Sequence, residues 1–277
     1  MAQRNPDRYT QGEDGFPVEI VGSWAEDKLK LLSDYVFASG GARKQYLGTG
    51  AAFIDPFCGP GRSQFRGKST FIDGSPIVAF KRALQSPGVF TSINISDDDP
   101  QLLAAARERL SNLNAPIIAF DGPANQAIPK MVQSLNPNGL HLAFLDPYNL
   151  ANLSFSLFES LSKLKRIDVI AHVSIADLRR NADRYAGKEF EQFDVFAPGW
   201  RDHVKTDVGK RAFRAAIMNY WSKKILELGL PQATQFELIS GDQGQELYWL
   251  ILLSRHELAH NLWKKISSEA KSPKFDF

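Results

Sequence analysis

The chain has a single cysteine, no long hydrophobic run and almost no net charge, and each shortage excludes a class of protein. With Cys58 alone, the chain can form neither an internal disulfide nor a multi-cysteine zinc or iron–sulfur centre by itself. The longest apolar stretch, residues 247–253, is far too short to cross a bilayer. A formal charge of +2 does not identify a nucleic-acid binder, so any basic surface has to be local.

The N-terminus lacks a feature as well, because residues 1–6 contain no apolar core of a signal peptide. One thiol in the chain fits a reducing compartment. We therefore expect a cytoplasmic protein without membrane contact. The composition is that of an ordinary globular protein, with 43% hydrophobic and 23% charged residues among 277, which is enough to bury a full core.

Short apolar runs alternate with amphipathic stretches through most of the chain. They predict strands at 52–57, 91–96, 116–120, 141–146 and 167–174, and helices at 75–85, 99–113, 123–135 and 154–164. Ser75-Pro76 and Asp99-Pro100 mark two of the helix starts. A helix at 208–228, strands at 234–240 and 246–254 and a last helix follow. The sequence thus predicts an α/β, Rossmann-like sheet of seven strands, mostly parallel, with an antiparallel last strand and helices on both faces.

These elements divide the chain into four parts. Residues 1–22, broken by prolines and glycines, are expected to form a loosely held N-terminal arm. Residues 23–175 are expected to form a cofactor-binding Rossmann-like core, which begins with a helix after Ser23. Residues 176–230 are expected to form a helical insertion, a candidate for binding a substrate or partner. Residues 231–277 would add the hairpin strands and the helix that complete the core.

The most informative segment follows the first predicted strand, where residues 55–61 read Asp-Pro-Phe-Cys-Gly-Pro-Gly. A strand that runs into a glycine turn lets backbone N–H groups approach an adenosine-bearing cofactor where a Cβ would collide. The third glycine of G-x-G-x-x-G is missing, and no Gly-Lys-Ser/Thr of a P-loop follows. The segment instead resembles the first motif of S-adenosylmethionine-dependent methyltransferases, above all those that methylate exocyclic amines of nucleic-acid bases. The alternative is a tight turn after a buried strand, in which Cys58 only packs.

This resemblance implies cofactor contacts at Asp55, Phe57, Gly59 and Gly61. Asp55 would hold the amino group of the methionine moiety, directly or through water. Few basic residues lie near the predicted pocket, which suits a zwitterionic amino-acid tail better than a pyrophosphate. S-adenosylmethionine is therefore favoured over a dinucleotide as the cofactor.

Acidic residues also end the second and third predicted strands. Asp97 or Asp98, at the end of the second, could accept hydrogen bonds from both ribose hydroxyls, while Asp99 is expected to cap the next helix. Asp121, at the end of the third, could accept from the adenine amine or could cap the helix that follows. A merely solvated acidic turn is the alternative at residues 97–99.

The fourth predicted strand ends in Asp146, Pro147 and Tyr148, which we take as the candidate catalytic residues. The segment resembles the D/N-P-P-Y/F motif of amine-directed methyltransferases. There a carboxylate or amide oxygen and a backbone carbonyl accept the protons of the target amine, and the aromatic ring stacks on the base. A base in a duplex would first have to be extruded. Here one proline is missing, so a turn without this chemistry, or with another, is the alternative.

Basic residues near the same edge are candidates for substrate binding. Two groups are singled out, one in the long loop that follows the glycine turn and one just past the fifth strand: Arg62, Arg66, Lys68, Arg179 and Arg180. In the loop they accompany Phe65, and cations with an aromatic ring suit phosphate contact and base stacking. The alternative for the second group is a solvated helix face paired with Asp177 and Asp183.

The string His256-Glu257-Leu258-Ala259-His260 formally matches the H-E-x-x-H motif of zinc peptidases. It follows a strand near the C-terminus, and no obvious third ligand comes after it. We therefore expect no metal site, and interpret His256 as the start of the last helix.

Taken in order, these motifs resemble the three-Cys-motif partner (TcmP) family. The resemblance also covers Trp24 with the Lys28-Leu29 helix, Gly74-Ser75-Pro76, and residues 250–256 with Trp263. It implies a bacterial protein with a Rossmann-like methyltransferase fold and a partner that carries a three-cysteine motif and is similar to radical S-adenosylmethionine proteins. Two functions follow: a methyltransferase that acts on a nucleic acid, or a non-catalytic binding module for that partner. The sequence predicts no oligomeric state.

Overall fold

The computed structural model describes residues 8–187, 189–241 and 243–267. Its centre is a seven-stranded sheet in the order β10-β11-β9-β8-β3-β6-β7. The bounds of these strands are β3 Ala52–Asp55, β6 Ser92–Asp97, β7 Ile117–Asp121, β8 His141–Leu145, β9 Ile167–Ser174, β10 Gln232–Ser240 and β11 Glu246–Ser254. The strands from β9 to β7 pair in parallel, and β11 runs antiparallel to both of its neighbours.

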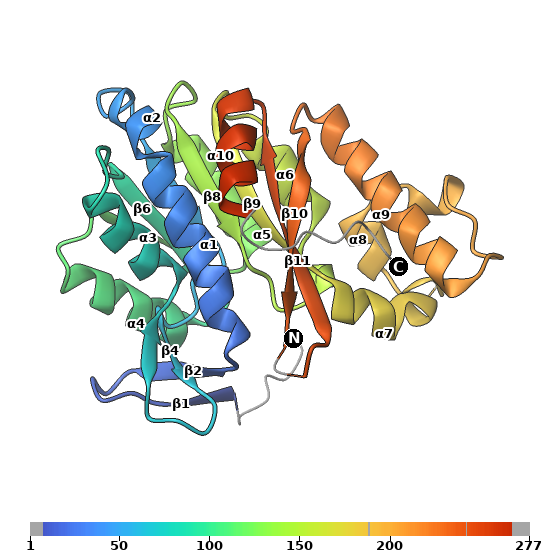
Figure 1. Ribbon diagram of the computed structural model, residues 1–277, viewed down its shortest axis with the longest axis horizontal. Helices are drawn as coiled ribbons and strands as arrows, with labels where there is room; N and C mark the ends of the chain where they lie inside the picture. The colour runs from blue at the N-terminus through green and yellow to red at the C-terminus, as the bar shows by residue number, and fades with distance from the viewer. Residues whose placement is uncertain (1–7, 188, 242, 268–277) are drawn as a thin grey trace.

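Each of these strands coincides with a predicted one, and no end differs by more than two residues. The predicted fold class is confirmed: the sheet is Rossmann-like, mostly parallel, and its last strand is antiparallel. Because β3, β6, β7, β8 and β9 are parallel, their carboxyl ends meet at one edge of the sheet. That edge lies in the lower part of Figure 1.

Helices cover both faces of the main sheet (Figure 1). Their bounds are α1 Trp24–Ala38, α2 Gly40–Lys44, α3 Ser75–Leu84, α4 Pro100–Ser111, α5 Ala124–Ser134, α6 Phe155–Leu161, α7 Ile175–Tyr185, α8 Gln192–Phe196, α9 Lys210–Glu227 and α10 Glu257–Ser267, with 3-10 turns at Leu150–Asn152 and Trp200–Asp202. One apolar layer joins α1, α3, α4 and α10 to the sheet through side chains such as Leu32, Phe80 and Trp263. The other joins the helices α5, α6, α7, α8 and α9 to the opposite face of the sheet through side chains such as Phe158 and Trp221. The core is therefore double, with the sheet between its layers.

Two helices have a proline in their first turn, as predicted, Pro76 in α3 and Pro100 in α4, but their caps differ. Asp99 caps α4 by accepting a hydrogen bond from the backbone N–H of Gln101. In α3 the N-cap is Gly74, and Ser75 already belongs to the helix. The Ser75 hydroxyl donates instead to Asp55 Oδ2, 2.6 Å away, and so links α3 to the end of β3.

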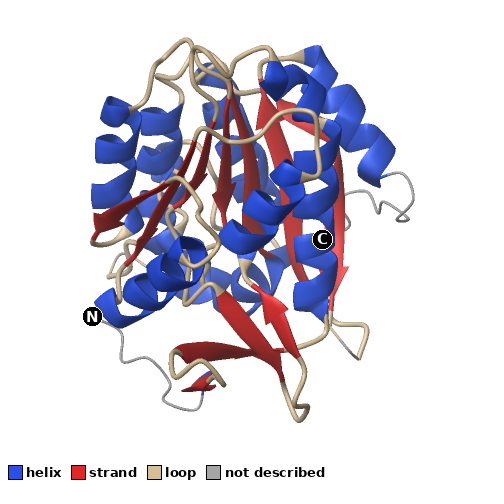
Figure 2. Ribbon diagram, turned by 90° about the vertical axis from the view of Figure 1, so that its left-hand side faces the viewer, coloured by secondary structure: helices blue, strands red, loops and turns tan. Residues whose placement is uncertain are grey.

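A second sheet of four strands, in the order β1-β2-β4-β5, lies beyond the carboxyl edge of the main sheet (Figure 2). Its strands are β1 Tyr9–Gln11, β2 Pro17–Val21, β4 Arg62–Phe65 and β5 Phe71–Asp73. The structure thus differs from the loosely held arm predicted at 1–22, in its described part, and from the long loop predicted after Gly61. The two segments are far apart in sequence, and β2 and β4 pair in parallel, so each supplies the partner that the other lacks locally.

Arg109 of α4 holds this second sheet against the segment that follows β3. Its buried guanidinium donates to the Asp14 carboxylate at 2.7 and 2.8 Å. It also donates to the carbonyl oxygens of Pro17 and Pro60 at 2.9 and 2.6 Å. The hydrogen bonds from Arg109 lower the pKa of Asp14 to about 2. Charge-assisted bonds of this kind are strong, so the β1–β2 turn, α4 and the glycine turn are fixed to one another.

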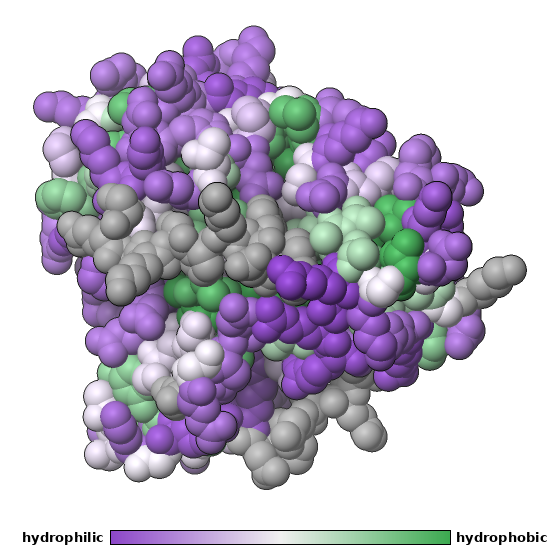
Figure 3. Space-filling view, turned by 45° about the vertical axis from the view of Figure 1, so that its right-hand side comes forward, coloured by the Kyte–Doolittle hydropathy of each residue, from purple (hydrophilic) through white to green (hydrophobic). Residues whose placement is uncertain are grey.

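The surface in Figure 3 is mainly hydrophilic, and its hydrophobic residues form small separate areas. Most large apolar side chains lie instead in the two core layers. Among residues 8–187, 189–241 and 243–267, no helix has the length and apolar character needed to cross a membrane.

Candidate cofactor and active site

The carboxyl end of β3 leads into the glycine turn, residues 56–61. Gly59 and Gly61 adopt φ values of 54° and 75°, in the left-handed region that favours glycine. A Cβ on Gly61 would lie 3.2 Å from the Cα of Ala106 in α4, so Gly61 is needed for close packing. The Cβ direction of Gly59 is open, and the nearest atom is Glu19 Oε2 at 4.0 Å. Gly59 therefore exposes its backbone to the side where a ligand could approach.

Asp55 ends β3 and is completely buried. Its Oδ2 accepts the Ser75 hydroxyl, and its Oδ1 accepts the backbone N–H of Phe57 at 3.2 Å. Burial raises the pKa of Asp55 to about 7, although both hydrogen bonds act in the opposite direction. The carboxylates of Asp146 and Asp97 raise it further, which also indicates that the three acids are close. Asp55 can therefore change charge near neutral pH, and a bound cation would favour its carboxylate form.

The acids of the two neighbouring strands meet at the same edge. Asp97 Oδ2 accepts the backbone N–H of Gly59 at 3.0 Å, and Asp97 Oδ1 accepts that of Asp99 at 3.0 Å. Asp98 is exposed beside it. In the pairing of β6 with β7, Asp97 lies opposite Asp121, which is also exposed. The predicted ribose and adenine acceptors are thus neighbours of the glycine turn.

The second sheet and the residue just before it, Glu19 and Arg8, add two side chains to this edge. Glu19 of β2 lies closest to the open side of Gly59. Its Oε1 accepts a hydrogen bond from Arg8 Nε at 2.8 Å. The Arg8 guanidinium in turn lies over the ring of Tyr148, 4.2 Å from its centroid. A chain of side chains therefore connects the glycine turn with the predicted catalytic corner.

Asp146 follows β8 and has two basic partners. Its Oδ2 accepts from the ammonium of Lys28 in α1, and its Oδ1 lies 2.7 Å from Nδ1 of His172 in β9. Burial acts to raise the pKa of Asp146, but the Lys28 charge and the His172 hydrogen bond outweigh it and hold the pKa well below its usual range. Burial lowers the pKa of His172. A neutral imidazole therefore donates its Nδ1–H to an ionised carboxylate.

The rest of the corner differs residue by residue. Pro147 is buried, whereas the Tyr148 side chain is 69% exposed. The segment that follows is fixed by the buried Asp177 of α7, whose Oδ2 accepts the backbone N–H of Leu150 at 2.9 Å. Asp177 Oδ1 accepts the Tyr185 hydroxyl at 2.9 Å. The turn with a single proline thus exposes the Tyr148 ring to solvent, and the backbone just after it is held by Asp177.

The predicted basic residues of the hairpin β4–β5 divide into two kinds. Arg62 is half-buried and lies over the Phe71 ring, 4.7 Å from its centroid. Arg66 and Lys68 are exposed at the turn of the hairpin. The Lys68 ammonium lies 5.8 Å from the Phe65 ring centroid. Cations and an aromatic ring are therefore neighbours at the tip.

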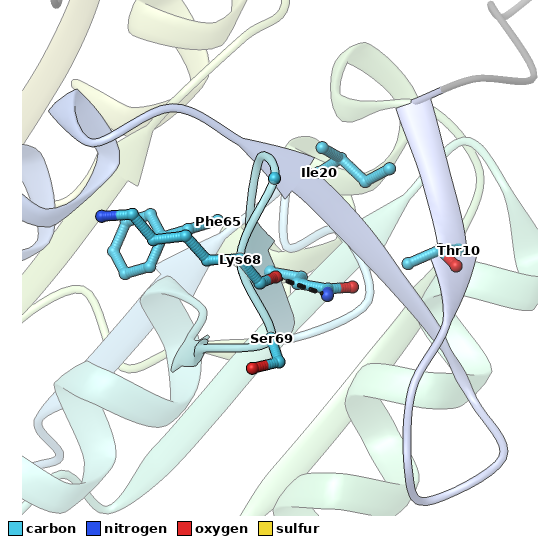
Figure 4. A pocket seen from close by; sticks show the side chains of 7 residues that line it. Thr10, Ile20, Phe65, Lys68 and Ser69 are labelled. Atoms are coloured by element: carbon cyan, nitrogen blue, oxygen red, sulfur yellow. Dashed lines mark hydrogen bonds between the residues drawn. The ribbon is translucent and has the colours of Figure 1, made fainter.

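An open pocket of about 300 Å³ lies against this hairpin (Figure 4). Its lining comes from β1, β2, β4 and the turn after β4: Thr10, Ile20, Gln64, Phe65, Gly67, Lys68 and Ser69. Figure 4 shows the Lys68 side chain extended alongside Phe65, and the Lys68 carbonyl accepts from the Gln64 amide at 2.7 Å. The pocket combines one ring, one cation and several hydrogen-bonding groups.

Arg179 and Arg180 of α7 do not pair with Asp177 and Asp183, which was the alternative considered from the sequence. Arg179 pairs with Glu246 of β11, and Arg180 Nε donates to a carbonyl of its own helix at 3.1 Å. Asp177 bonds to Leu150 and Tyr185 rather than to an arginine, and Asp183 pairs with a lysine of α9 at 2.5 Å. Both arginines are exposed.

The H-E-x-x-H string lies at the start of α10. His256 Nδ1 accepts the backbone N–H of Leu258 at 3.1 Å, and His260 Nε2 lies 2.8 Å from the carbonyl oxygen of Ser254. In the part of the chain that the structure describes, no group of three or more His, Cys, Asp or Glu side chains could hold a metal ion. The two histidines serve the junction between β11 and the last helix.

Four side chains at this site had no role predicted from the sequence: Lys28, His172, Glu19 and Arg8. Lys28 is 118 residues from its partner Asp146, and no local pattern connects them. His172 carried a usable signal, because it is a polar residue inside the apolar strand β9 and such residues usually have a hydrogen-bond partner. Glu19 and Arg8 could be placed only once β2 was known to pair with β4.

No family model matches the chain, and no curated protein matches its sequence. Among solved structures, the chain is similar to a Legionella pneumophila protein assigned to the family model DUF519, with a TM-score of 0.52, 9% identity, and 86% of this chain and 91% of that chain covered. An O-methyltransferase from Bacillus cereus, solved in complex with SAH, matches with a TM-score of 0.46, 14% identity and coverage of 82% and 80%. At such identities the likeness shows the fold alone, a Rossmann-like α/β architecture.

Proposed function

We propose that this chain binds S-adenosylmethionine at the carboxyl edge of β3, β6 and β7 and methylates an exocyclic amine of a nucleic-acid base. One observation carries the proposal. The Asp97 carboxylate accepts the backbone N–H of Gly59, and, in addition to burial, the charges of both Asp97 and Asp146 raise the pKa of Asp55 at the end of β3. The segments predicted to hold the cofactor and the target amine, which are far apart in sequence, would thus act at one edge.

The residues present fit this cofactor. The open Cβ direction of Gly59 is the kind of cradle that a side chain would fill and a ligand can use. Asp55 would hold the amino group, Asp97 or Asp98 the ribose and Asp121 the adenine amine, while Phe57 and Gly61 shape the turn. S-adenosylmethionine supplies an already activated methyl group, so the protein has to position the acceptor rather than provide a strong base.

Asp146, Pro147 and Tyr148 would receive the substrate. Each oxygen of an ionised carboxylate has two lone pairs, so Asp146 keeps acceptor capacity beside Lys28 and His172. With the Pro147 carbonyl it would accept the protons of the target amine. The exposed Tyr148 ring already carries one planar group, the Arg8 guanidinium, and a base would take that place by stacking.

A nucleic acid would reach this corner across the second sheet. Arg66, Lys68 and Phe65 offer phosphate contact and stacking at the hairpin tip, and Arg62 lies at its base. Arg179 and Arg180 are exposed on α7, the helix that follows β9, and would extend the contact there.

The test begins with calorimetric titration of S-adenosylmethionine and S-adenosylhomocysteine into the purified chain. Transfer of a tritiated methyl group to bacterial DNA and RNA is then measured for the natural chain and for Asp146→Asn. We expect binding of both compounds, and a variant that binds but does not transfer. A natural chain without affinity for either compound would contradict the proposal, and transfer by Asp146→Asn at the natural rate would remove Asp146 from it.

A second candidate function is a non-catalytic module that binds a three-cysteine-motif partner in the bacterial cytoplasm. Both Asp146 oxygens already have protein partners and Arg8 covers Tyr148, which favours a site that is closed in the isolated chain. Co-expression with such a partner separates the two functions. Stable complex formation without methyl transfer supports the module, whereas transfer by the chain alone supports the enzyme.

A further inference from the structure

We propose that Lys28 is a positioning residue of the candidate methyl-transfer site, which keeps the Asp146 carboxylate ionised and fixed for a substrate amine. This inference rests on the proposed function and deepens it. Lys28 would not touch the substrate itself. It would act through Asp146, with His172 as the second support.

The geometry gives Asp146 one support on each side. Lys28 lies in the first half of α1, and its ammonium binds Oδ2 from the helix layer that covers the sheet. His172 lies in β9, the strand beside β8, and its imidazole binds Oδ1 at 2.7 Å. The side chains of Lys28 and Asp146 are only 17% and 19% exposed. Contacts from two different layers leave the carboxylate little freedom to rotate.

A purely structural ion pair is the competing explanation, and energetics argue against it. Exposed pairs contribute little to stability, and a largely buried pair loses much of its attraction to desolvation. What such a pair does achieve is a fixed orientation and charge. Asp146 is the residue at this edge for which orientation and charge matter most under the proposed function.

Other titratable groups surround the pair. Tyr248 of β11 packs its ring on His172, with centroids 3.9 Å apart, and burial keeps its phenol neutral by raising its pKa. Glu19 of β2 adds negative charge on the Lys28 side, and Asp27 acts electrostatically on Tyr248. Asp55 of β3 adds negative charge on the Asp146 side only where it is ionised, because burial raises its pKa to about 7. Removing the Lys28 ammonium would take away the cation that binds the Asp146 carboxylate directly, and would therefore favour protonation of Asp146.

Three variants test the proposal. Lys28→Met keeps the length of the side chain without its charge, and Lys28→Arg keeps the charge. Lys30→Met is the matched control, because Lys30 lies on the same helix and also pairs with an acid, Asp34, but its side chain is 68% exposed. Lys28→Gln, which can hydrogen-bond without a charge, takes the place of Lys28→Met if that variant does not fold.

The first readout is independent of catalysis. Carbon-13 NMR follows the carboxyl of Asp146 through a pH titration, with its signal assigned from Asp146→Asn. We expect the natural chain and Lys30→Met to keep Asp146 ionised below pH about 4, the ordinary aspartate pKa. In Lys28→Met the pKa of Asp146 should rise above the ordinary aspartate value, and in Lys28→Arg it should return to the low value of the natural chain.

The second readout is methyl transfer to heat-denatured bacterial DNA and total RNA. Affinity for S-adenosylmethionine should stay within about twofold in all variants, because Lys28 is assigned no cofactor contact. The kcat of Lys28→Met should fall about tenfold or more, with the acid limb of its pH profile moved to higher pH, and Lys28→Arg should recover part of the loss.

The two failures are distinguishable. A natural chain that binds no S-adenosylmethionine contradicts the proposed function, while the Asp146 titration still decides whether Lys28 fixes the carboxylate. If the natural chain transfers methyl groups and Lys28→Met matches Lys30→Met in both the Asp146 titration and the pH profile, Lys28 has no positioning role.

Discussion

The backbone N–H of Gly59 donates to the carboxylate of Asp97 across 3.0 Å, which fixes the turn after β3 to the end of the neighbouring strand. Gly59 adopts a left-handed φ of 54°, which glycine tolerates, and its Cβ direction is open. The bond therefore holds open the backbone surface on which the proposed cofactor would lie.

Gly59→Ala should abolish most of the affinity for S-adenosylmethionine, by about tenfold or more, because its methyl group would project into the open side of the turn. Because alanine is strained at the left-handed φ of this position, the substitution should also lower the free energy of unfolding by roughly 1 kcal/mol. Gly67→Ala is the control, since Gly67 has φ 71° and no atom within 4 Å of an added Cβ, but lies at the hairpin tip. Calorimetric titration and thermal denaturation measure both effects. Equal affinities in the two variants would place the cofactor elsewhere.

Asp55 should make the unliganded chain less stable as the pH rises from about 5 to 8. Burial raises the folded pKa of Asp55 to about 7, far above the unfolded value of about 3.9. The folded state then binds this proton more tightly, so the stabilisation is complete below the unfolded pKa and is lost as pH passes the folded one. Melting temperatures across this range should fall more for the natural chain than for Asp55→Asn, which cannot titrate. Parallel curves would argue against a raised pKa.

The same carboxyl should make affinity for S-adenosylmethionine increase with pH over this range. Only the ionised form of Asp55 attracts the cationic amino group of the ligand, and that form becomes dominant above pH about 7. Titrations at pH 6 and pH 8 should differ severalfold for the natural chain and little for Asp55→Asn. An affinity that weakens with rising pH would exclude the proposed contact.

Tyr148→Ala should weaken binding of a single-stranded oligonucleotide by about tenfold, since one stacked base contributes roughly 1–3 kcal/mol. Stability should hardly change, because the ring is 69% exposed and leaves no buried cavity. Fluorescence anisotropy with a labelled oligonucleotide gives the affinity. Tyr148→Phe keeps a stacking ring and should bind almost normally, and a loss as large as that of the alanine variant would point to the hydroxyl instead.

Replacing Arg66 and Lys68 together by alanine should reduce the salt dependence of nucleic-acid binding. For single strands the slope of log K against log salt should fall by roughly 0.7 for each lost phosphate contact. Lys163 and Lys165 are exposed at the opposite, amino edge of the sheet, beside the start of β9, and their double alanine variant is the control. An unchanged slope in the Arg66 and Lys68 variant would remove the hairpin tip from the proposed interface.

The seven main strands could be predicted because each is a local apolar run of ordinary length, bounded by turn residues. The acids at their ends could be placed at one edge for the same reason, since parallel strands end together. Asp55, Asp97 and Asp146 follow from sequence in this sense.

The second sheet could not be predicted in the same way. Its strands are three to five residues long, and the pairing of β2 with β4 joins segments more than forty positions apart. The pairing of Lys28 with Asp146 depends likewise on how α1 packs over the finished sheet. Such contacts are consequences of the fold and are not encoded in any local pattern.

Arg109 has one consequence for the dynamics of the site. A single buried guanidinium binds both the turn between the first two strands and the carbonyl of Pro60, so opening either partner removes some of the acceptors of a buried charge. We therefore expect amide hydrogens of residues 17–21 and 59–65 to exchange with solvent as one cooperative unit. A ligand bound on the glycine turn would then slow exchange in the N-terminal strands, which it need not touch.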